Sequence, residues 1–541
     1  MLGIPVVAGM FGVLLPAFGY FPIVGRFELG WDVFEALVDH PAVPRAAWLS
    51  FKVGLCATLI SVFLTVWLTS TLSGGRVWRI MTGLLGPFLA LPHAAAAFGI
   101  AFLIAPSGLL MRLMSPWATG FDRPPDWLII QDPAGWSMVA ALVLKEVPFL
   151  LLLTLAALPS LRTDRFLPVA VSMGYTRSSA FVLTIWPRLY PQIRLGVYLV
   201  LAYSMSVVDV AQIIGPTTPP TLSVLVVKWM NDPDLTNRML GAAGAVLQLA
   251  LVGAAMVLWW CGEKLTAALY RIVIQRGFRI PFVSGTKVPA ATAAAVLISA
   301  LLGGIGVIVI WSFAGFWGFP DVLPDAMTFR NWERQLDGVL TASVTTAVIG
   351  IISVCFALIL TIWMFETGRV VPKWLLYLPL IVPQISFLPG IQILALQTGL
   401  TQGFMPVLLA HLVFVLPYFV LTLSGAYAAW DRGYAHTASA LGATGLRTLF
   451  VVKLPMLIGP ILIAAAIAIA VSVGQYLPTL LLGGGRIETL TTEAVTLASG
   501  GDRRAIGVFA VAQVFASIVP YLLAICVPLV LWRNRKGMIG A

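Results

Sequence analysis

Long apolar segments alternate with short polar loops along the whole of this 541-residue chain. About twelve of the segments are long enough to cross the ~30 Å hydrocarbon core of a bilayer. Backbone polar groups in lipid must be satisfied within their own segment, which favours helices over strands for continuous runs of about twenty residues. The pattern predicts an all-α polytopic membrane protein with spans near 4–25, 47–70, 80–106, 136–158, 191–215, 241–262, 286–313, 338–363, 373–398, 404–428, 458–482 and 505–532.

The composition agrees with this pattern and gives it an orientation. Charged residues make up only 10% of the chain, whereas soluble domains approach a quarter. About 20 of the 33 Lys and Arg lie in alternate loops with about 4 acids, and the other loops hold about 11 bases and about 16 acids. We interpret the net charge of +11 as the positive-inside bias of a membrane protein with cytoplasmic termini, and expect no nucleic-acid binding.

Two basic loops share one pattern of small residues. The first, Leu167–Tyr190, reads LPVAVSMGYTRSSAFVLTIWPRLY, and the second, at 435–456, reads AHTASALGATGLRTLFVVKLPM. In each, an Ala is followed four residues later by a Gly, and a Pro stands thirteen residues beyond that Gly. These residues are Ala170, Gly174 and Pro187 in the first loop and Ala438, Gly442 and Pro455 in the second.

The loops follow the fourth and the tenth predicted spans, on the same side of the membrane. An even number of spans in each half makes the repeat parallel, so we expect two six-helix halves. The predicted division is a first half at 1–262, a cytoplasmic linker at 263–287 and a second half at 288–541. In each loop the Ala and Gly are spaced i, i+4, which predicts one helix face of small residues that a partner approaches closely.

The paired loops resemble the "EAA" loops of permease subunits of binding-protein-dependent ABC importers. That family pattern is Glu-Ala-Ala, three residues, Gly and an apolar run to Pro, and Pro168 and His436 replace its glutamate here. We expect Pro168 to suit the first turn of a helix. Two copies in one chain are similar to the fused permeases of ferric-iron, thiamine and polyamine importers. The segments SMSVVDVAQIIGPTTPPTL at 204–222 and VSVGQYLPTLLLGGG at 471–485 fit that group.

The resemblance implies the type I importer permease fold and a multi-pass location in the bacterial inner membrane. It also implies two ATP-binding subunits on the cytoplasmic side, an extracytoplasmic solute-binding protein, and thiamine or another small cationic solute as cargo. The chain has no G-x-x-x-x-G-K-S/T phosphate loop, so we expect ATP hydrolysis in a separate subunit. The four His form no ligand cluster, and no cofactor, metal site or catalytic residue is expected.

Few charges fall inside the predicted spans. Lys145 and Glu146 precede Pro148, and Asp209 lies in the fifth span, with Gln475 near the matching place of the second half. A charge there costs about 2.5–3.5 kcal/mol on insertion scales and points to function. We expect Asp209 either to pair with Lys145 as a structural lock or to line the path of a cationic substrate. Neighbouring helix positions point about 100° apart, so Lys145 and Glu146 face different points.

Two other classes of protein share parts of this pattern. An ion-coupled secondary transporter with six-plus-six helices has the same span count and repeat, and would use Glu146 and Asp209 as coupling carboxylates. It has no need of the twin loops. A membrane enzyme would need a recognisable pair or metal cluster of acids in its outer loops, and the sequence shows none.

Overall fold

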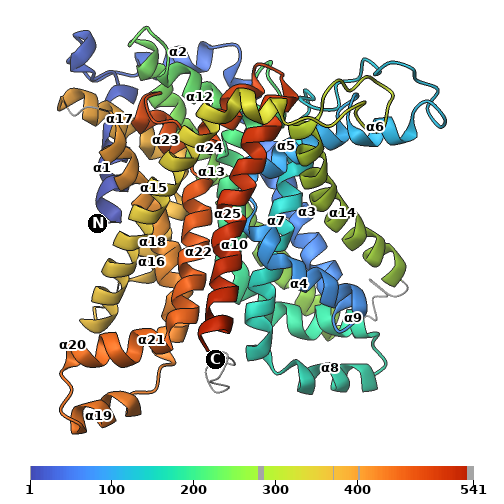
Figure 1. Ribbon diagram of the computed structural model, residues 1–541, viewed down its shortest axis with the longest axis vertical. Helices are drawn as coiled ribbons and strands as arrows, with labels where there is room; N and C mark the ends of the chain where they lie inside the picture. Colours follow the sequence, from blue (N-terminus) through green and yellow to red (C-terminus); the bar gives the residue numbers. More distant parts are fainter. Residues whose placement is uncertain (1, 278–285, 370, 400–401, 533–541) are drawn as a thin grey trace.

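The computed structural model describes residues 2–277, 286–369, 371–399 and 402–532 (Figure 1). Over these ranges the chain is helical, and its β-structure is limited to two isolated bridges. The all-α prediction is confirmed. The helices of the first half are α1 (Gly3–Ala17), α2 (Asp32–Asp39), α3 (Val43–Leu72), α4 (Arg76–Ala90), α5 (His93–Ile104), α6 (Leu109–Met114), α7 (Trp136–Ala157), α8 (Thr163–Ser172), α9 (Arg177–Ala180), α10 (Trp186–Ser206), α11 (Asp209–Ile214), α12 (Leu222–Met230) and α13 (Asn237–Gln275).

The second half repeats this order of elements. Its helices are α14 (Lys287–Phe313), α15 (Arg330–Glu366), α16 (Lys373–Ile381), α17 (Gln384–Gln397), α18 (Phe404–Ala428), α19 (Gly433–Ala440), α20 (Gly445–Thr448), α21 (Leu454–Met456), α22 (Ile458–Val473), α23 (Leu477–Gly483), α24 (Leu490–Ala498) and α25 (Arg503–Leu531). Short helices such as α12 and α24 take the same places in the two halves. The order of elements is that of a parallel repeat.

Each predicted apolar run coincides with a helix or with a helix broken near its middle. In the described residues, eight helices are long and apolar enough to span a membrane, and two bent pairs bring the number to ten. The bent pairs are Trp374–Ile381 with Gln384–Gln397, at 88°, and Gly445–Met456 with Ile458–Val473, at 74°. Helix α1 is shorter, at 15 residues, and α10 stops at Ser206, where the fifth run breaks. The polytopic fold is confirmed, with several of its spans broken.

The two halves exchange their first helices. Helix α1 packs along α17 of the second half, and α14 packs along α5 of the first half. A single buried hydrophobic cluster extends through both halves as a result. The predicted linker at 263–287 begins as the last turns of α13, and residues 278–285 lie outside the described residues. The division of the chain into halves at these positions remains a prediction.

Candidate functional site

Two helical hairpins lie at one end of the molecule, opposite the end that carries α2 and α12 (Figure 1). The first hairpin, residues 163–185, contains α8, α9 and a π-helical turn, and the second hairpin, residues 433–453, contains α19, α20 and the matching turn. They occupy the two loops that the sequence pattern singles out. The pattern thus corresponds to one supersecondary structure present twice.

The glycine of each hairpin ends a helix. Gly174 lies two residues beyond α8 with φ +88°, and the Tyr175 N–H donates to the carbonyl of Ala170 at 3.3 Å. In the second hairpin the Ala443 N–H donates to the carbonyl of Ala438 at 3.0 Å, and Gly442 between them has φ +81°. This is a Schellman cap, which favours Gly because its conformation is left-handed. The expectation of one helix face shared by the Ala and the Gly is therefore wrong, since each Gly lies outside the helix.

The other members of the pattern also have local roles. Ala170 and Ala438 are buried within the protein. Pro187 and Pro455 are the second residues of α10 and α21, directly after the π-helical turns, and each lies inside a continuous helical stretch. Pro168 is the sixth residue of α8, so its expected place in the first turn is wrong. The repeated spacing therefore builds the hairpin itself, and other side chains present its outer surface.

Both hairpins expose apolar side chains among basic and polar ones. The apolar side chains that are at least 45% accessible include Val169, Val171 and Met173 in the first hairpin and Leu441, Leu446, Phe450 and Val451 in the second. Exposed apolar patches of this kind mark interaction sites. The two hairpins thus present a pair of similar contact surfaces at one end of the molecule.

A carboxylate of a long helix makes a polar contact in or beside each hairpin. In the second half, Lys453 lies 2.7 Å from Glu366 at the end of α15, and the Tyr427 hydroxyl donates to the same carboxylate. In the first half, Glu263 of α13 lies 2.7 Å from Arg194 and accepts a hydrogen bond from Tyr190 at 2.6 Å, both on α10 beside the hairpin. These contacts link the second hairpin to α15, and they link α10, directly after the first hairpin, to α13.

Lys145 stabilises a helix break. Its buried ammonium donates to the carbonyls of Phe88 at 2.7 Å and Leu91 at 2.6 Å, where α4 ends before α5. Among the ion pairs of the described residues, none joins Lys145 to Asp209. The side chain proposed as the partner of Asp209 thus has two backbone partners instead.

We expect Lys145→Met to destabilise the protein by several kcal/mol. The substitution leaves two buried carbonyls without a donor, and each such group costs about 1–3 kcal/mol. Thermal unfolding of the purified protein in detergent checks this, with the exposed Lys264→Met as control. Equal stability of the two variants would show that the carbonyls find other donors.

Glu146 points away from Lys145, as adjacent helix positions require. Its carboxylate lies 3.5 Å from Nε2 of His93, the first residue of α5. The His93 ring packs against Tyr203 of α10, with centroids 4.7 Å apart and the ring planes at 54°. Glu146 and its histidine partner therefore lie where α5, α7 and α10 meet.

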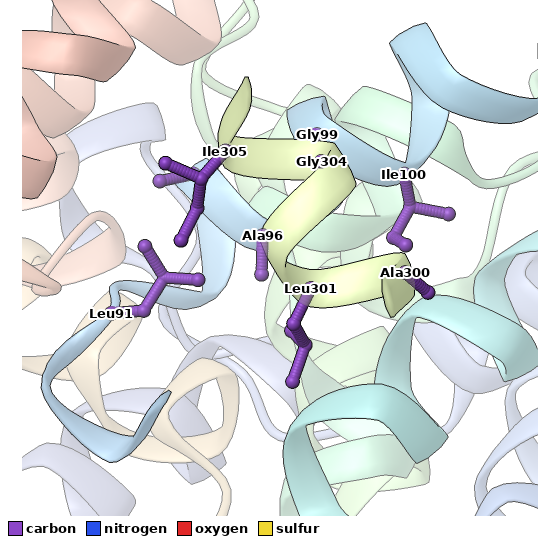
Figure 2. A pocket seen from close by; sticks show the side chains of 9 residues that line it. Leu91, Ala96, Gly99, Ile100, Ala300, Leu301, Gly304 and Ile305 are labelled. Atoms are coloured by element: carbon purple, nitrogen blue, oxygen red, sulfur yellow. The ribbon is translucent and has the colours of Figure 1, made fainter. Parts of the chain in front are cut away.

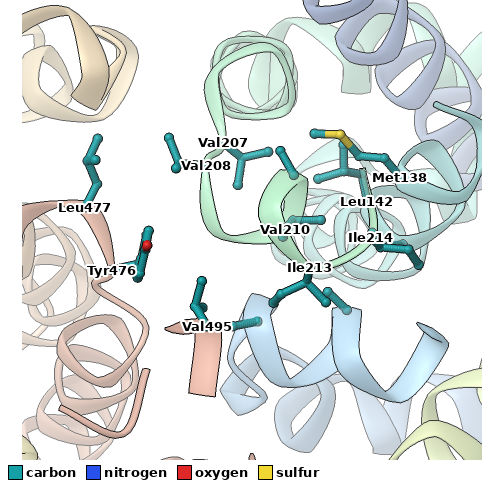
Figure 3. Packing of buried hydrophobic residues seen from close by; sticks show 14 of the residues in the cluster. Met138, Leu142, Val207, Val208, Val210, Ile213, Ile214, Tyr476, Leu477 and Val495 are labelled. Carbon is teal, nitrogen blue, oxygen red and sulfur yellow. The ribbon is translucent and has the colours of Figure 1, made fainter. Parts of the chain in front are cut away.

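Asp209 begins α11, directly after a break in the helix at Val207–Val208. The second half has a matching break at 474–476, before α23. The Tyr476 hydroxyl donates to Gln212 across the halves at 2.7 Å, and Figure 3 shows the residues of the two breaks facing one another. Gln475 accepts a weak hydrogen bond from Gln384 at 3.4 Å. The two broken helices thus meet at the boundary between the halves.

Buried side chains maintain both breaks. Gln248 donates to the carbonyl of Met205 at 3.0 Å, and Gln513 donates to the Thr491 hydroxyl, which in turn donates to the carbonyl of Val473. Unwound backbone in a membrane is tolerated only with such partners. Both breaks are therefore built features of the fold.

Two histidines are part of this region, although their positions in the sequence predict no ligand cluster. His93 contacts Glu146, and His411 of α18 joins Ser472 at 2.8 Å to Thr479 at 2.9 Å, on either side of the second break. The signal that could have found them is a polar ring inside an otherwise apolar run. Their importance depends on partners far away in the sequence.

An apolar crevice lies between α5 and α14. Figure 2 shows its lining of Leu, Ile, Ala and Gly side chains, which bear no polar atom. Gly99 and Gly304 face one another there, so the crevice is part of the helix crossing. It offers nothing to orient a polar solute and is not the candidate site.

Comparison with known proteins agrees with this geometry. The model of the family "binding-protein-dependent transport system inner membrane component" matches residues 353–532. The inner membrane ABC transporter permease protein YnjC of Escherichia coli is 28% identical over 508 residues, which cover 93% of this chain and 92% of the relative. The chain is therefore similar to inner-membrane ABC transporter permeases over nearly its whole length. Its fold as a fused, two-half permease of the type I importer group follows from the same match.

Shorter relatives match one half of the permease. The putative 2-aminoethylphosphonate transport system permease protein PhnV of Salmonella typhimurium is 28% identical over 211 residues, covering 37% of this chain and 78% of the relative. The spermidine/putrescine transport system permease protein PotC of Haemophilus influenzae is 21% identical over 204 residues, with 36% and 79% covered. A single half of this permease thus corresponds to most of such a relative.

Proposed function

We propose that this permease forms the translocation path of an ABC importer and couples it to ATP hydrolysis by two separate ATPase subunits. The observation that carries the proposal is the pair of hairpins, which have the same caps and exposed apolar side chains at one end of the molecule. One ATPase subunit would dock on each hairpin. A solute-binding protein would deliver the cargo at the opposite end.

The hairpin anchors support a mechanism of coupling. Closure of two ATPase subunits would draw the hairpins together, and the contacts of Glu263 and Glu366 would carry that movement into α13 and α15. The halves would then rock about their common boundary, where the two helix breaks meet. The permease itself supplies the path and the coupling, with no covalent chemistry. In this orientation the hairpins and both termini are cytoplasmic, although the C-terminal tail lies outside the described residues.

The cargo we propose is a small solute that carries an amine or another cationic group. The names of two relatives mention 2-aminoethylphosphonate and spermidine/putrescine, which all contain amines. Thiamine, the cargo implied by the sequence resemblance, is also a cation. The positive charge is the chemical feature that these solutes share.

Reconstitution in vesicles tests the proposed function. We expect no ATP hydrolysis by the purified permease alone, and uptake only with the ATPase subunits, the solute-binding protein and ATP all present. Dissipating a proton gradient should leave this uptake unchanged. Uptake by the permease alone, driven by a proton gradient, would instead establish the secondary transporter class.

A further inference from the structure

The helix breaks place a buried carboxylate at the boundary between the halves. Asp209 is 7% exposed, and it follows directly on the unwound residues of α10–α11. Tyr476, at the break of the second half, is bonded to Gln212 one turn further along α11. Asp209 is therefore next to the surface along which the two halves would move.

Negative charge in this region is incompletely balanced. Glu146 is 4% exposed and has His93 as its ion-pair partner, while Lys145 is occupied by two backbone carbonyls. In the part of the chain that the structure describes, no basic side chain lies within ion-pair distance of Asp209. Buried charges are usually paired. His93, which pairs with Glu146, is also the basic side chain that acts on Asp209. Two buried carboxylates thus share one histidine, and a mobile cation would complete the site.

Aromatic side chains from both halves surround the carboxylates. Tyr203 packs against His93 with the ring planes at 54°, and it lies within electrostatic range of both Asp209 and Glu146. From the second half, Tyr476 lies within electrostatic range of Asp209, and Tyr418 within range of Glu146. Aromatic faces attract organic cations, by about 2 kcal/mol or more where water is excluded. The combination of carboxylate and tyrosine suits an ammonium group better than a neutral or anionic one.

We propose that Asp209 and Glu146, with Tyr203, Tyr418 and Tyr476, form a binding site for a small organic cation in the translocation path. This inference rests on the proposed function and specifies where the cargo is recognised. An organic ammonium ion fits better than a metal ion, because the described residues contain no group of three or more His, Cys, Asp or Glu side chains able to hold a metal. Residues of both halves contribute, so opening the boundary would release the cation.

A structural role of Asp209 gives a different expectation. Asp209 is the first residue of α11, and its carboxylate lies near the backbone amides of that turn. The side chain of Asn has the same size and also has an oxygen that accepts hydrogen bonds. The variant Asp209→Asn therefore preserves that acceptor and removes only the charge, which separates the two roles.

The test uses a carbodiimide that reacts with buried carboxyl groups. The full-length permease in lipid nanodiscs is labelled with dicyclohexylcarbodiimide, and peptide mapping locates the label. We expect label on Asp209 or Glu146, and protection by putrescine, thiamine or tetramethylammonium but not by maltose or phosphate. A ligand at ten times its dissociation constant leaves about one site in eleven free, so labelling should fall about tenfold.

Variants make the result specific. Asp209→Asn should fold normally and lose most of the protection by cations at Glu146, whereas Asp232→Asn in an outer loop should behave as the wild type. Absence of label at both carboxyls, no protection by any of the three cations, or equal protection by maltose would overturn the site. Cation protection without ATP-driven uptake would retain the site and refute the proposed function. ATP-driven uptake without protection by cations would refute the site and support the proposed function.

Discussion

Gly390→Ala is expected to prevent assembly of the permease. A Cβ atom at Gly390 would lie 1.7 Å from the carbonyl oxygen of Gly9 and 2.7 Å from the amide nitrogen of Val13. Both are backbone atoms of α1, so no side chain can rotate away to make room. Overpacking in a well-packed core costs about 1–3 kcal/mol, and a backbone clash of this depth lies at or beyond the upper limit. Helix α1 should detach from α17, and the exchange between the halves should fail.

The equivalent crossing of α5 and α14 provides a graded comparison. A Cβ atom at Gly304 would lie 3.2 Å from the backbone of Gly99, a tight contact that small shifts relieve. A Cβ atom at Gly306, on the same helix, would meet nothing within 4 Å. We expect the yield of monodisperse protein, measured by size-exclusion chromatography, to fall strongly for Gly390→Ala, modestly for Gly304→Ala and not at all for Gly306→Ala. Equal yields of all three would show that α1 does not pack on α17 as described.

A glutamate on the outer surface of either hairpin is expected to uncouple transport without preventing assembly. Met173 and Leu441 are 62% and 83% exposed and stand directly before the capping glycines. Buried apolar residues central to an interface each contribute about 2 kcal/mol or more, and a charge there adds a desolvation penalty. We expect Met173→Glu and Leu441→Glu each to reduce ATP-driven uptake by more than tenfold, since about 1.4 kcal/mol corresponds to tenfold.

Leu128→Glu serves as the matched control for these variants. Leu128 is 70% exposed and lies in the loop between α6 and α7, outside both hairpins. It should transport and assemble as the wild type does. Substituting the glycines would be a less specific test, because a residue with a Cβ atom in the left-handed region costs about 1–2 kcal/mol in the hairpin itself. Normal uptake by both hairpin variants would exclude these surfaces as the coupling contacts.

The sequence was informative wherever structure is local. Each predicted apolar run contains helix because its length and continuity leave no other way to satisfy the backbone in lipid. The spacing of Ala170, Gly174 and Pro187 located the first hairpin, and the second copy located its equivalent. The reason given for the spacing was wrong, since the periodicity of a helix does not show where that helix ends. The left-handed φ of Gly174 became evident only in the structure.

Long-range contacts were beyond sequence reasoning. Lys145 was considered as the partner of Asp209, yet its partners are the carbonyls of Phe88 and Leu91, which become available only because α4 ends there. The position of a free backbone carbonyl cannot be inferred from the charged residues of the sequence. The exchange of α1 and α14 between the halves likewise depends on shape complementarity between helix surfaces. Apolar helices of similar composition cannot be assigned to neighbours from the sequence.

The number of ATPase subunits bound through the hairpins tests the central claim most directly. Native mass spectrometry of the permease co-purified with its ATPase measures that number. We predict two ATPase subunits on the wild-type permease and on Leu128→Glu, and none on the double variant with Met173→Glu and Leu441→Glu. Two ATPase subunits retained by the double variant, or none bound by the wild type, would contradict the assignment of the hairpins as the docking sites.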